Sequence, residues 1–267
     1  MSAFPALARA IAGGTAYADR GSGEPLVLIH GVGMRAEAWT PQIAHFSRSR
    51  RVVALDLPGH GMSAPAPAGA TLAHYVDAAA GLIETLDLSR VALAGHSLGA
   101  LVAIGVALER PDRIASLIAF NAVYCRDPES RRAVERRADE IAASGSVGDV
   151  EVPLARWFGT EPDAAAEASR EAAGAWLQAV DPAGYAAAYG AFARSDEAHR
   201  GRLGALAIPA LFATGDLDPN STPAMSRAMA MAAPRGEALV LEGSRHMMNL
   251  VEADAVNAMM DRFLARP

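Results

Sequence analysis

The chain has 267 residues, of which 51% are hydrophobic, and a formal net charge of -6 at pH 7. This length and composition suffice for one large buried core, and the acidic balance excludes nucleic acid or an anionic membrane surface as the main partner, since both require a basic face. The single cysteine, Cys125, excludes an internal disulfide and a cysteine metal site. A small diffusible substrate fits these limits.

Apolar runs at regular intervals predict an α/β protein. Residues 9–21 are expected to form an antiparallel edge hairpin around Gly13 and Gly14. From Leu26 onward, short apolar runs alternate with stretches of helical length, which is the pattern of βα units that build a parallel sheet. Continuous apolar runs are typical of strands that are covered on both faces. The six predicted strands are residues 26–30, 51–57, 91–94, 114–120, 209–215 and 237–242.

The alternation stops over residues 123–202, where the chain is rich in Ala, Arg, Glu and Asp at helical spacing. We expect this segment to be a helical cap inserted between core segments 1–122 and 203–267. Some of its aromatic residues are expected to line a pocket and others to anchor the cap, namely Trp157, Phe158, Trp176, Tyr185, Tyr189 and Phe192. Arg126, Arg156 and Arg194 are candidates to receive a substrate carboxylate, although a solvated surface charge is the commoner role of each.

The most informative motif is Gly95-His96-Ser97-Leu98-Gly99, which follows a predicted strand and opens a helix-like segment. A serine alcohol is a poor nucleophile unless its oxygen is exposed on a sharp strand-to-helix turn, close to backbone N–H groups. Glycine two residues before and after the serine permits that turn, because a Cβ there would crowd the neighbouring strand and helix. Ser97 is therefore the candidate nucleophile.

Two further loops carry chemistry after predicted strands, which is where open parallel sheets place their active sites. Asp216 and Asp218 follow residues 209–215, and His246 follows residues 237–242. By position, either aspartate fits the role of the carboxylate that pairs with a catalytic histidine. His246 is the histidine that follows both a strand and the candidate acid. The other histidines are interpreted as loop support (His30, His60), as directed away from the nucleophile (His96) or as surface residues (His45, His74, His199).

Together these segments resemble the α/β-hydrolase family. The matching stretches are His30-Gly31, residues 56–63, the Gly95 to Gly99 motif, residues 215–218 and residues 244–246. The resemblance implies an eight-stranded, mostly parallel sheet with a helical cap, and a triad of Ser97, Asp218 and His246. It also implies an oxyanion hole built from the backbone N–H groups of Val32 and Leu98. The family pattern Gly-x-x-Asp selects Asp218 over Asp216, and gives Asp56 a structural role in the loop at residues 58–63.

Serine at position 97 argues against a dehalogenase or an epoxide hydrolase, which need a carboxylate nucleophile. We expect hydrolysis of a small carboxylic ester or lactone through an acyl-enzyme on Ser97, with His246 as general base and acid and Asp218 orienting it. Within the family, the sequence is most similar to 3-oxoadipate enol-lactonases and small carboxylesterases. The alternatives are C–C bond hydrolysis, cofactor-free perhydrolysis, amide hydrolysis, or a non-enzymatic ligand-binding member of the fold.

No cofactor or metal is expected, because the sequence lacks His and carboxylate ligands at metal spacing and has no Gly-x-Gly-x-x-Gly after the first strand. The expected partner is a small ester or lactone, with no nucleic acid and no membrane, and a homo-oligomer is an open alternative. The first twelve residues lack the pattern of a secretory signal, and no run reaches about 20 apolar residues. We therefore expect a cytoplasmic protein.

Overall fold

The computed structural model describes residues 4–266, and across these residues eight strands form one sheet in the order β1-β2-β4-β3-β5-β6-β7-β8. The edge pair β1 and β2 is the predicted antiparallel hairpin, β2 also runs antiparallel to β4, and the strands from β4 to β8 are parallel. The predicted fold class is confirmed. The strands are β1 (Ala10–Ala12), β2 (Thr15–Arg20), β3 (Pro25–Ile29), β4 (Arg51–Leu55), β5 (Val91–His96), β6 (Ile114–Phe120), β7 (Ala210–Gly215) and β8 (Gly236–Leu241).

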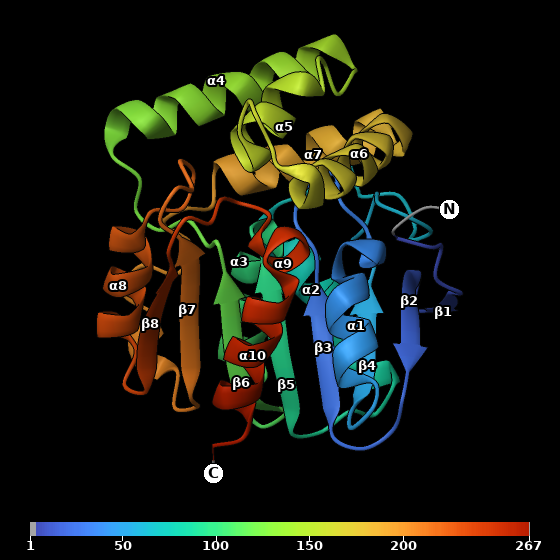
Figure 1. The fold of residues 1–267 in the computed structure, drawn as a ribbon, viewed down its shortest axis with the longest axis vertical. Coiled ribbons are helices and arrows are strands. Elements are labelled where there is room, and N and C mark those ends of the chain that lie inside the picture. Colours follow the sequence, from blue (N-terminus) through green and yellow to red (C-terminus); the bar gives the residue numbers. More distant parts are fainter. Residues whose placement is uncertain (1–3, 267) are drawn as a thin grey trace.

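Helices cover both faces of this sheet and bury a hydrophobic layer on each (Figure 1). Along β3, Leu26 and Leu28 join one layer while Val27 and Ile29 join the other, because side chains alternate across a strand. The short helices η1 (Ala36–Trp39) and α9 (Met248–Val251) pack beside α1 (Thr40–Phe46) and α10 (Ala253–Leu264) on the first face. The second face carries α2 (Leu72–Thr85), α3 (Leu98–Glu109), η2 (Leu203–Ala205) and α8 (Pro223–Ala232).

The segment after β6 is helical, as predicted, and lies above the carboxyl end of the parallel strands (Figure 1). Aspartate side chains cap three of its helices by accepting backbone N–H groups, which is why those helices begin where they do. The helices are α4 (Pro128–Ser144), α5 (Glu151–Phe158), α6 (Ala164–Ala179) and α7 (Pro182–Ala193). The division of the chain at residues 123 and 202 into a core and a separate cap domain stays a prediction.

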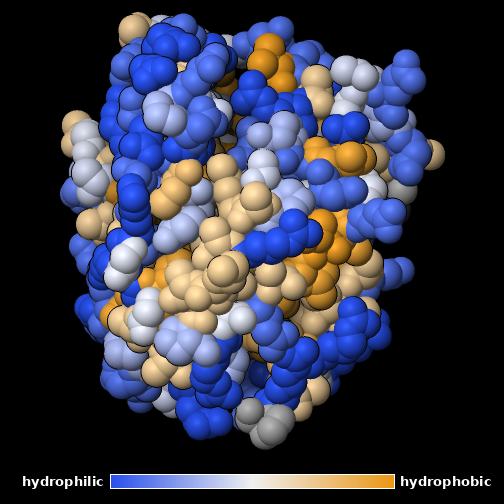
Figure 2. Space-filling view, turned by 90° about the vertical axis from the view of Figure 1, so that its left-hand side faces the viewer, coloured by the Kyte–Doolittle hydropathy of each residue, from blue (hydrophilic) through white to orange (hydrophobic). Residues whose placement is uncertain are grey.

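The side of the molecule that carries α8 and the edge strand β8 is shown in Figure 2, where hydrophobic residues gather in the middle and hydrophilic residues cover the upper part. Met231 on α8 is 89% exposed, and Leu217 in the loop after β7 is 46% exposed. Among the described helices, none combines the length and the apolar character needed to cross a membrane.

Candidate active site

Ser97 lies on the turn between β5 and α3, with a backbone φ of 56° and ψ of -118° that residues with a side chain rarely adopt. A Cβ at Gly95 would overlap the carbonyl oxygen of Gly99, and a Cβ at Gly99 would overlap that of Ile29. The glycines of the motif are therefore required by close backbone contacts, as the sequence predicts. Strand β5 continues to His96, two residues beyond its predicted end, so Ser97 is the one residue between the strand and α3.

His246 and Asp218 come from two neighbouring strand ends and form a hydrogen-bonded pair. The His246 Nδ1 lies 2.7 Å from Asp218 Oδ2, and both side chains are buried. Burial alone would raise the pKa of the Asp218 carboxyl, but the charge and the hydrogen bond of His246 hold that pKa well below its usual range. Asp216, the rival acid, is exposed. Because Nδ1–H donates to the carboxylate, the Nε2 of His246 is left as the basic nitrogen.

Three more donors surround the Asp218 carboxylate, and the sequence interpretation missed them. Asn121 Nδ2 donates to Oδ2 at 2.8 Å, the Ser221 hydroxyl donates to the same oxygen, and the Asn220 N–H donates to Oδ1 at 2.8 Å. Asn121 follows β6, the strand next to the one that leads to Asp218. The position of Asn121 at the end of this neighbouring strand places its amide beside the acid, where it acts as a donor.

His96 was predicted to be directed away from the nucleophile, and the structure adds a contact with the catalytic base that this prediction did not include. Its Nε2–H donates to the backbone carbonyl of His246 at 2.7 Å, and the two ring centroids are 4.8 Å apart. Burial lowers the pKa of His96 to about 3, so the ring is neutral at ordinary pH. The indole of Trp157 stacks on His246 at 5.9 Å between centroids. His246 is thus held through its carboxylate partner, its own carbonyl and its ring face.

The loop after β3 is held by the two histidines interpreted as loop support. Gly33 N–H donates to His60 Nε2 at 3.0 Å, and Leu57 N–H donates to His30 Nε2 at 2.9 Å. Asp56 accepts hydrogen bonds from the backbone of Ala36 and Met62, which is the structural role expected of it.

The two residues predicted to form an oxyanion hole adjoin Ser97 and the cavity. Val32 lines the cavity, and Leu98 is the first residue of α3. No hydrogen-bond partner of either N–H is present among the described residues. The first N–H groups of a helix have no partner within it, so the Leu98 N–H is available to a ligand.

The remaining histidines are not all surface residues. His74 is exposed and His45 is half-exposed beside Asp261, but His199 is buried and its Nε2–H donates to the carbonyl of Leu101 at 2.8 Å. The prediction for His199 is wrong because the segment after α7 returns beneath the cap helices and packs against α3.

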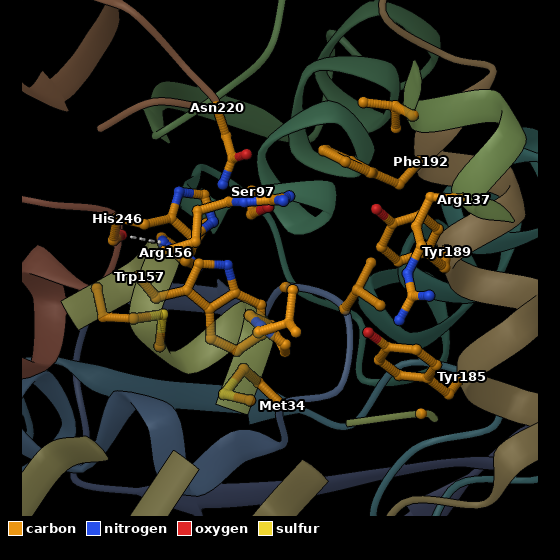
Figure 3. Close-up of a pocket in the computed structure, with 18 of the residues that line it drawn as sticks. Met34, Ser97, Arg137, Arg156, Trp157, Tyr185, Tyr189, Phe192, Asn220 and His246 are labelled. Atoms are coloured by element: carbon orange, nitrogen blue, oxygen red, sulfur yellow. Dashed lines mark hydrogen bonds between the residues drawn. The ribbon is translucent and has the colours of Figure 1, made fainter. Parts of the chain in front are cut away.

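Ser97 and His246 both line a cavity of about 420 Å³ under the cap helices (Figure 3). Four of the six cap aromatics line it, namely Trp157, Tyr185, Tyr189 and Phe192, while Phe158 and Trp176 pack into the core. The expectation of a partly aromatic pocket is confirmed. Within the part of the chain that the structure describes, no group of three His, Cys, Asp or Glu side chains is placed to hold a metal ion.

The arginines of the cap differ in position. Arg156 lines the cavity, and so does Arg137, which the sequence interpretation did not single out. Arg126 is buried with its guanidinium 4.7 Å from the centre of the Phe192 ring and 3.7 Å from an Asp196 oxygen. Arg194 pairs with Asp139 on the surface. Of the three arginines considered as carboxylate ligands, one is therefore in place to meet a substrate.

Comparisons with known proteins agree with this geometry. The Alpha/beta hydrolase family model matches residues 26–259. The chain is 45% identical over 248 residues to (E)-2-((N-methylformamido)methylene)succinate hydrolase of Acinetobacter baylyi, covering 93% of each chain. It is 31% identical over 163 residues to 2-(acetamidomethylene)succinate hydrolase of Mesorhizobium japonicum, covering 61% of this chain and 58% of that one.

Solved structures give the same result. The enol-lactonase of Burkholderia xenovorans superposes with a TM-score of 0.85 at 26% identity, over 97% of this chain and all (100%) of that one. A thermophilic esterase of Thermogutta terrifontis with malate bound gives a TM-score of 0.81 at 28% identity, over 94% and 92% of the two chains. These relatives and neighbours are hydrolases. The chain belongs to the alpha/beta hydrolase family and is a hydrolase.

Proposed function

We propose that this hydrolase cleaves an acyl bond of a small substrate through a covalent acyl-enzyme on Ser97. The observation that carries the proposal is the pair of His246 and Asp218, 2.7 Å apart, beside a cavity that Ser97 also lines. A buried carboxylate that accepts a hydrogen bond from Nδ1 fixes the imidazole tautomer. It also stabilises the imidazolium that forms when Nε2 takes a proton.

The proposed reaction has two halves. The Nε2 of His246 accepts the Ser97 proton as the serine oxygen attacks the carbonyl carbon, and the backbone N–H groups of Val32 and Leu98 stabilise the negative oxygen. His246 then gives the proton to the leaving group. In the second half, water attacks the acyl-enzyme with His246 again as base, which frees Ser97 and the carboxylic acid product.

The names of the similar proteins suggest which kind of substrate bond this enzyme cleaves. The sequence alone favours a small ester or lactone, and the structurally similar enol-lactonase acts on a lactone. The relative that is 45% identical is named for a formamido group, which is an amide, on a methylenesuccinate. We therefore propose amide cleavage in a substituted methylenesuccinate as a second candidate. Ester, lactone and amide are all acyl groups that the same residues can cleave.

Replacing the nucleophile tests the mechanism. Ser97→Ala is expected to lower kcat by about three orders of magnitude or more, because the covalent step is lost. The assay uses p-nitrophenyl esters of graded chain length, a panel of lactones and an N-acyl enamine. Ser146→Ala, which changes an exposed serine, serves as the matched control. Near wild-type turnover by Ser97→Ala would reject the mechanism.

A fluorophosphonate probe gives a second, independent readout. It is expected to modify Ser97 in the wild-type protein, as identified by mass spectrometry, and to label His246→Gln far more slowly because the base is gone. Equal labelling of both proteins would contradict the role of His246.

We further propose a cytoplasmic location, since the one cysteine leaves no internal disulfide to form.

A further inference from the structure

The cap contributes two guanidinium groups to the cavity that contains Ser97. Arg137 comes from α4 and Arg156 from the last turn of α5. In Figure 3, Arg156 lies on the side of His246, and Arg137 lies across the cavity beside Tyr189. The two positive charges therefore face the same space from different sides.

These charges are largely unneutralised within the cavity. The nearest ion partner of Arg137 is Glu140 at 3.5 Å, one helical turn away and largely in solvent. Arg156 forms no ion pair with any residue in the described part of the chain. Asp149 is the carboxylate among the lining residues, and its Oδ1 already accepts the N–H of Glu151 at 2.9 Å. The lining therefore has two guanidinium charges and one carboxylate charge, which leaves it with a net positive charge.

Two phenol hydroxyls add neutral donors to the same region. Burial raises the pKa of Tyr185 and of Tyr189, while the positive charges of Arg137 and Arg156 act on both hydroxyls in the opposite direction. Both rings line the cavity, and their hydroxyls stay protonated at neutral pH. Guanidinium groups and hydroxyls are the donors that proteins use for carboxylates.

The loop between α4 and α5 leaves room for one of these groups. A Cβ at Gly148 would lie 3.0 Å from Arg137 Nη2, and the backbone there has a φ of 79°. A side chain at this position would therefore be strained and would press on the guanidinium. Glycine at position 148 therefore leaves the guanidinium of Arg137 unobstructed on this side.

We propose that the cap cluster of Arg137, Arg156, Tyr185 and Tyr189 binds the two carboxylates of a small dicarboxylic acid derivative whose acyl carbon lies at Ser97. Two separate guanidinium groups match two carboxylates, and an Arg–carboxylate pair gives both charge and a directed hydrogen bond. This inference rests on the proposed function, because the cluster is assigned to the substrate of that same site.

Binding to a protein that cannot turn over tests the cluster apart from catalysis. Calorimetry on Ser97→Ala with succinate, monomethyl succinate and dimethyl succinate compares ligands of similar shape that carry two, one and no charges. We expect Kd to rise about tenfold at each methylation, the usual size of one charge-assisted hydrogen bond. Arg137→Gln or Arg156→Gln, added to Ser97→Ala, is expected to weaken succinate binding about tenfold. Arg194→Gln is the matched control, with its arginine paired on the surface.

Each result decides the proposal. Equal Kd values for the three ligands would overturn the carboxylate site. Equal Kd values for succinate and monomethyl succinate would overturn the dicarboxylate class. Loss of binding in Arg194→Gln as large as in Arg156→Gln would show that the effect is general charge and not this cluster. None of these outcomes affects the Ser97→Ala turnover test, so the proposed function and this inference fail separately.

Discussion

His96 connects the nucleophile turn to the loop of the catalytic base through one hydrogen bond, from its Nε2–H to the carbonyl of His246. Its ring is buried and neutral, so it donates at any working pH. We expect His96→Phe to lower kcat about 10- to 100-fold with little change in KM, because a small displacement of His246 disturbs proton transfer more than substrate binding. Steady-state kinetics on a p-nitrophenyl ester measure this split.

Glutamine separates positioning from packing at this residue. His96→Gln can place an amide N–H near the Nε2 position, and is expected to recover most of the lost kcat. If Gln and Phe are equally impaired, or if KM changes in place of kcat, the hydrogen bond is not what holds His246. Thermal unfolding of both variants checks that the buried site has not collapsed.

The sequence predicts the position of a site residue when that residue lies directly after a recognisable strand. Ser97, Asp218 and His246 are readable because each lies directly after a predicted strand, and parallel strands end at one edge of the sheet. The partners Asn121 and His96 are not readable in the same way. Their hydrogen bonds join segments 97 and 150 residues apart, and a local pattern does not reveal which donor meets which acceptor.

At the scale of elements, Glu252 lies at the junction of α9 and α10, where its carboxyl group is partly buried. Burial raises the pKa of Glu252 to about 7, with Asp163 contributing in the same direction, and its Oε2 is buried without a partner. An acid whose pKa is raised on folding is neutral in the native state at low pH. It destabilises the native state as pH rises from the unfolded pKa of about 4.5 through 7.

Glu252→Gln is therefore expected to stabilise the protein by about 1–2 kcal/mol at pH 8, a figure reduced for the partial exposure of this side chain, and to have little effect at pH 4.5. Urea unfolding at the two pH values measures the difference. Glu242→Gln, which changes an exposed glutamate in the loop after β8, is the comparison variant. A stabilisation of equal size at both pH values would show that it does not come from the carboxyl charge.

Strands were easier to predict than helices in this chain. The six parallel strands lie within one or two residues of their predicted bounds, because each is a short apolar run closed by a polar or glycine-rich loop. The cap helices were expected as a class but without bounds. Alanine at many positions favours helix equally well throughout, so the ends are set by capping aspartates and by Gly145 and Gly159, which the hydrophobic pattern does not mark.

For the molecule as a whole, the order of motifs along the chain predicted the fold, but it did not predict which histidines are buried. His30, His60, His96 and His199 are all buried, and burial lowers the pKa of each. For His60 and His96 the pKa falls to about 3, and for His199 to about 4. The unfolded chain takes up these protons near pH 6.5, but the native protein does not.

The native state should therefore lose stability as pH falls from about 6.5 to 4, by up to about 2 kcal/mol per buried histidine at pH 5. The paired carboxylates of Asp56 and Asp218 act in the same direction only at lower pH, below the usual carboxyl pKa of about 4. Urea midpoints between pH 7.5 and 5 measure the slope. His199→Gln, which keeps a donor for Leu101, is expected to reduce that slope. A midpoint constant over this range would mean that these imidazoles take up protons in the folded protein.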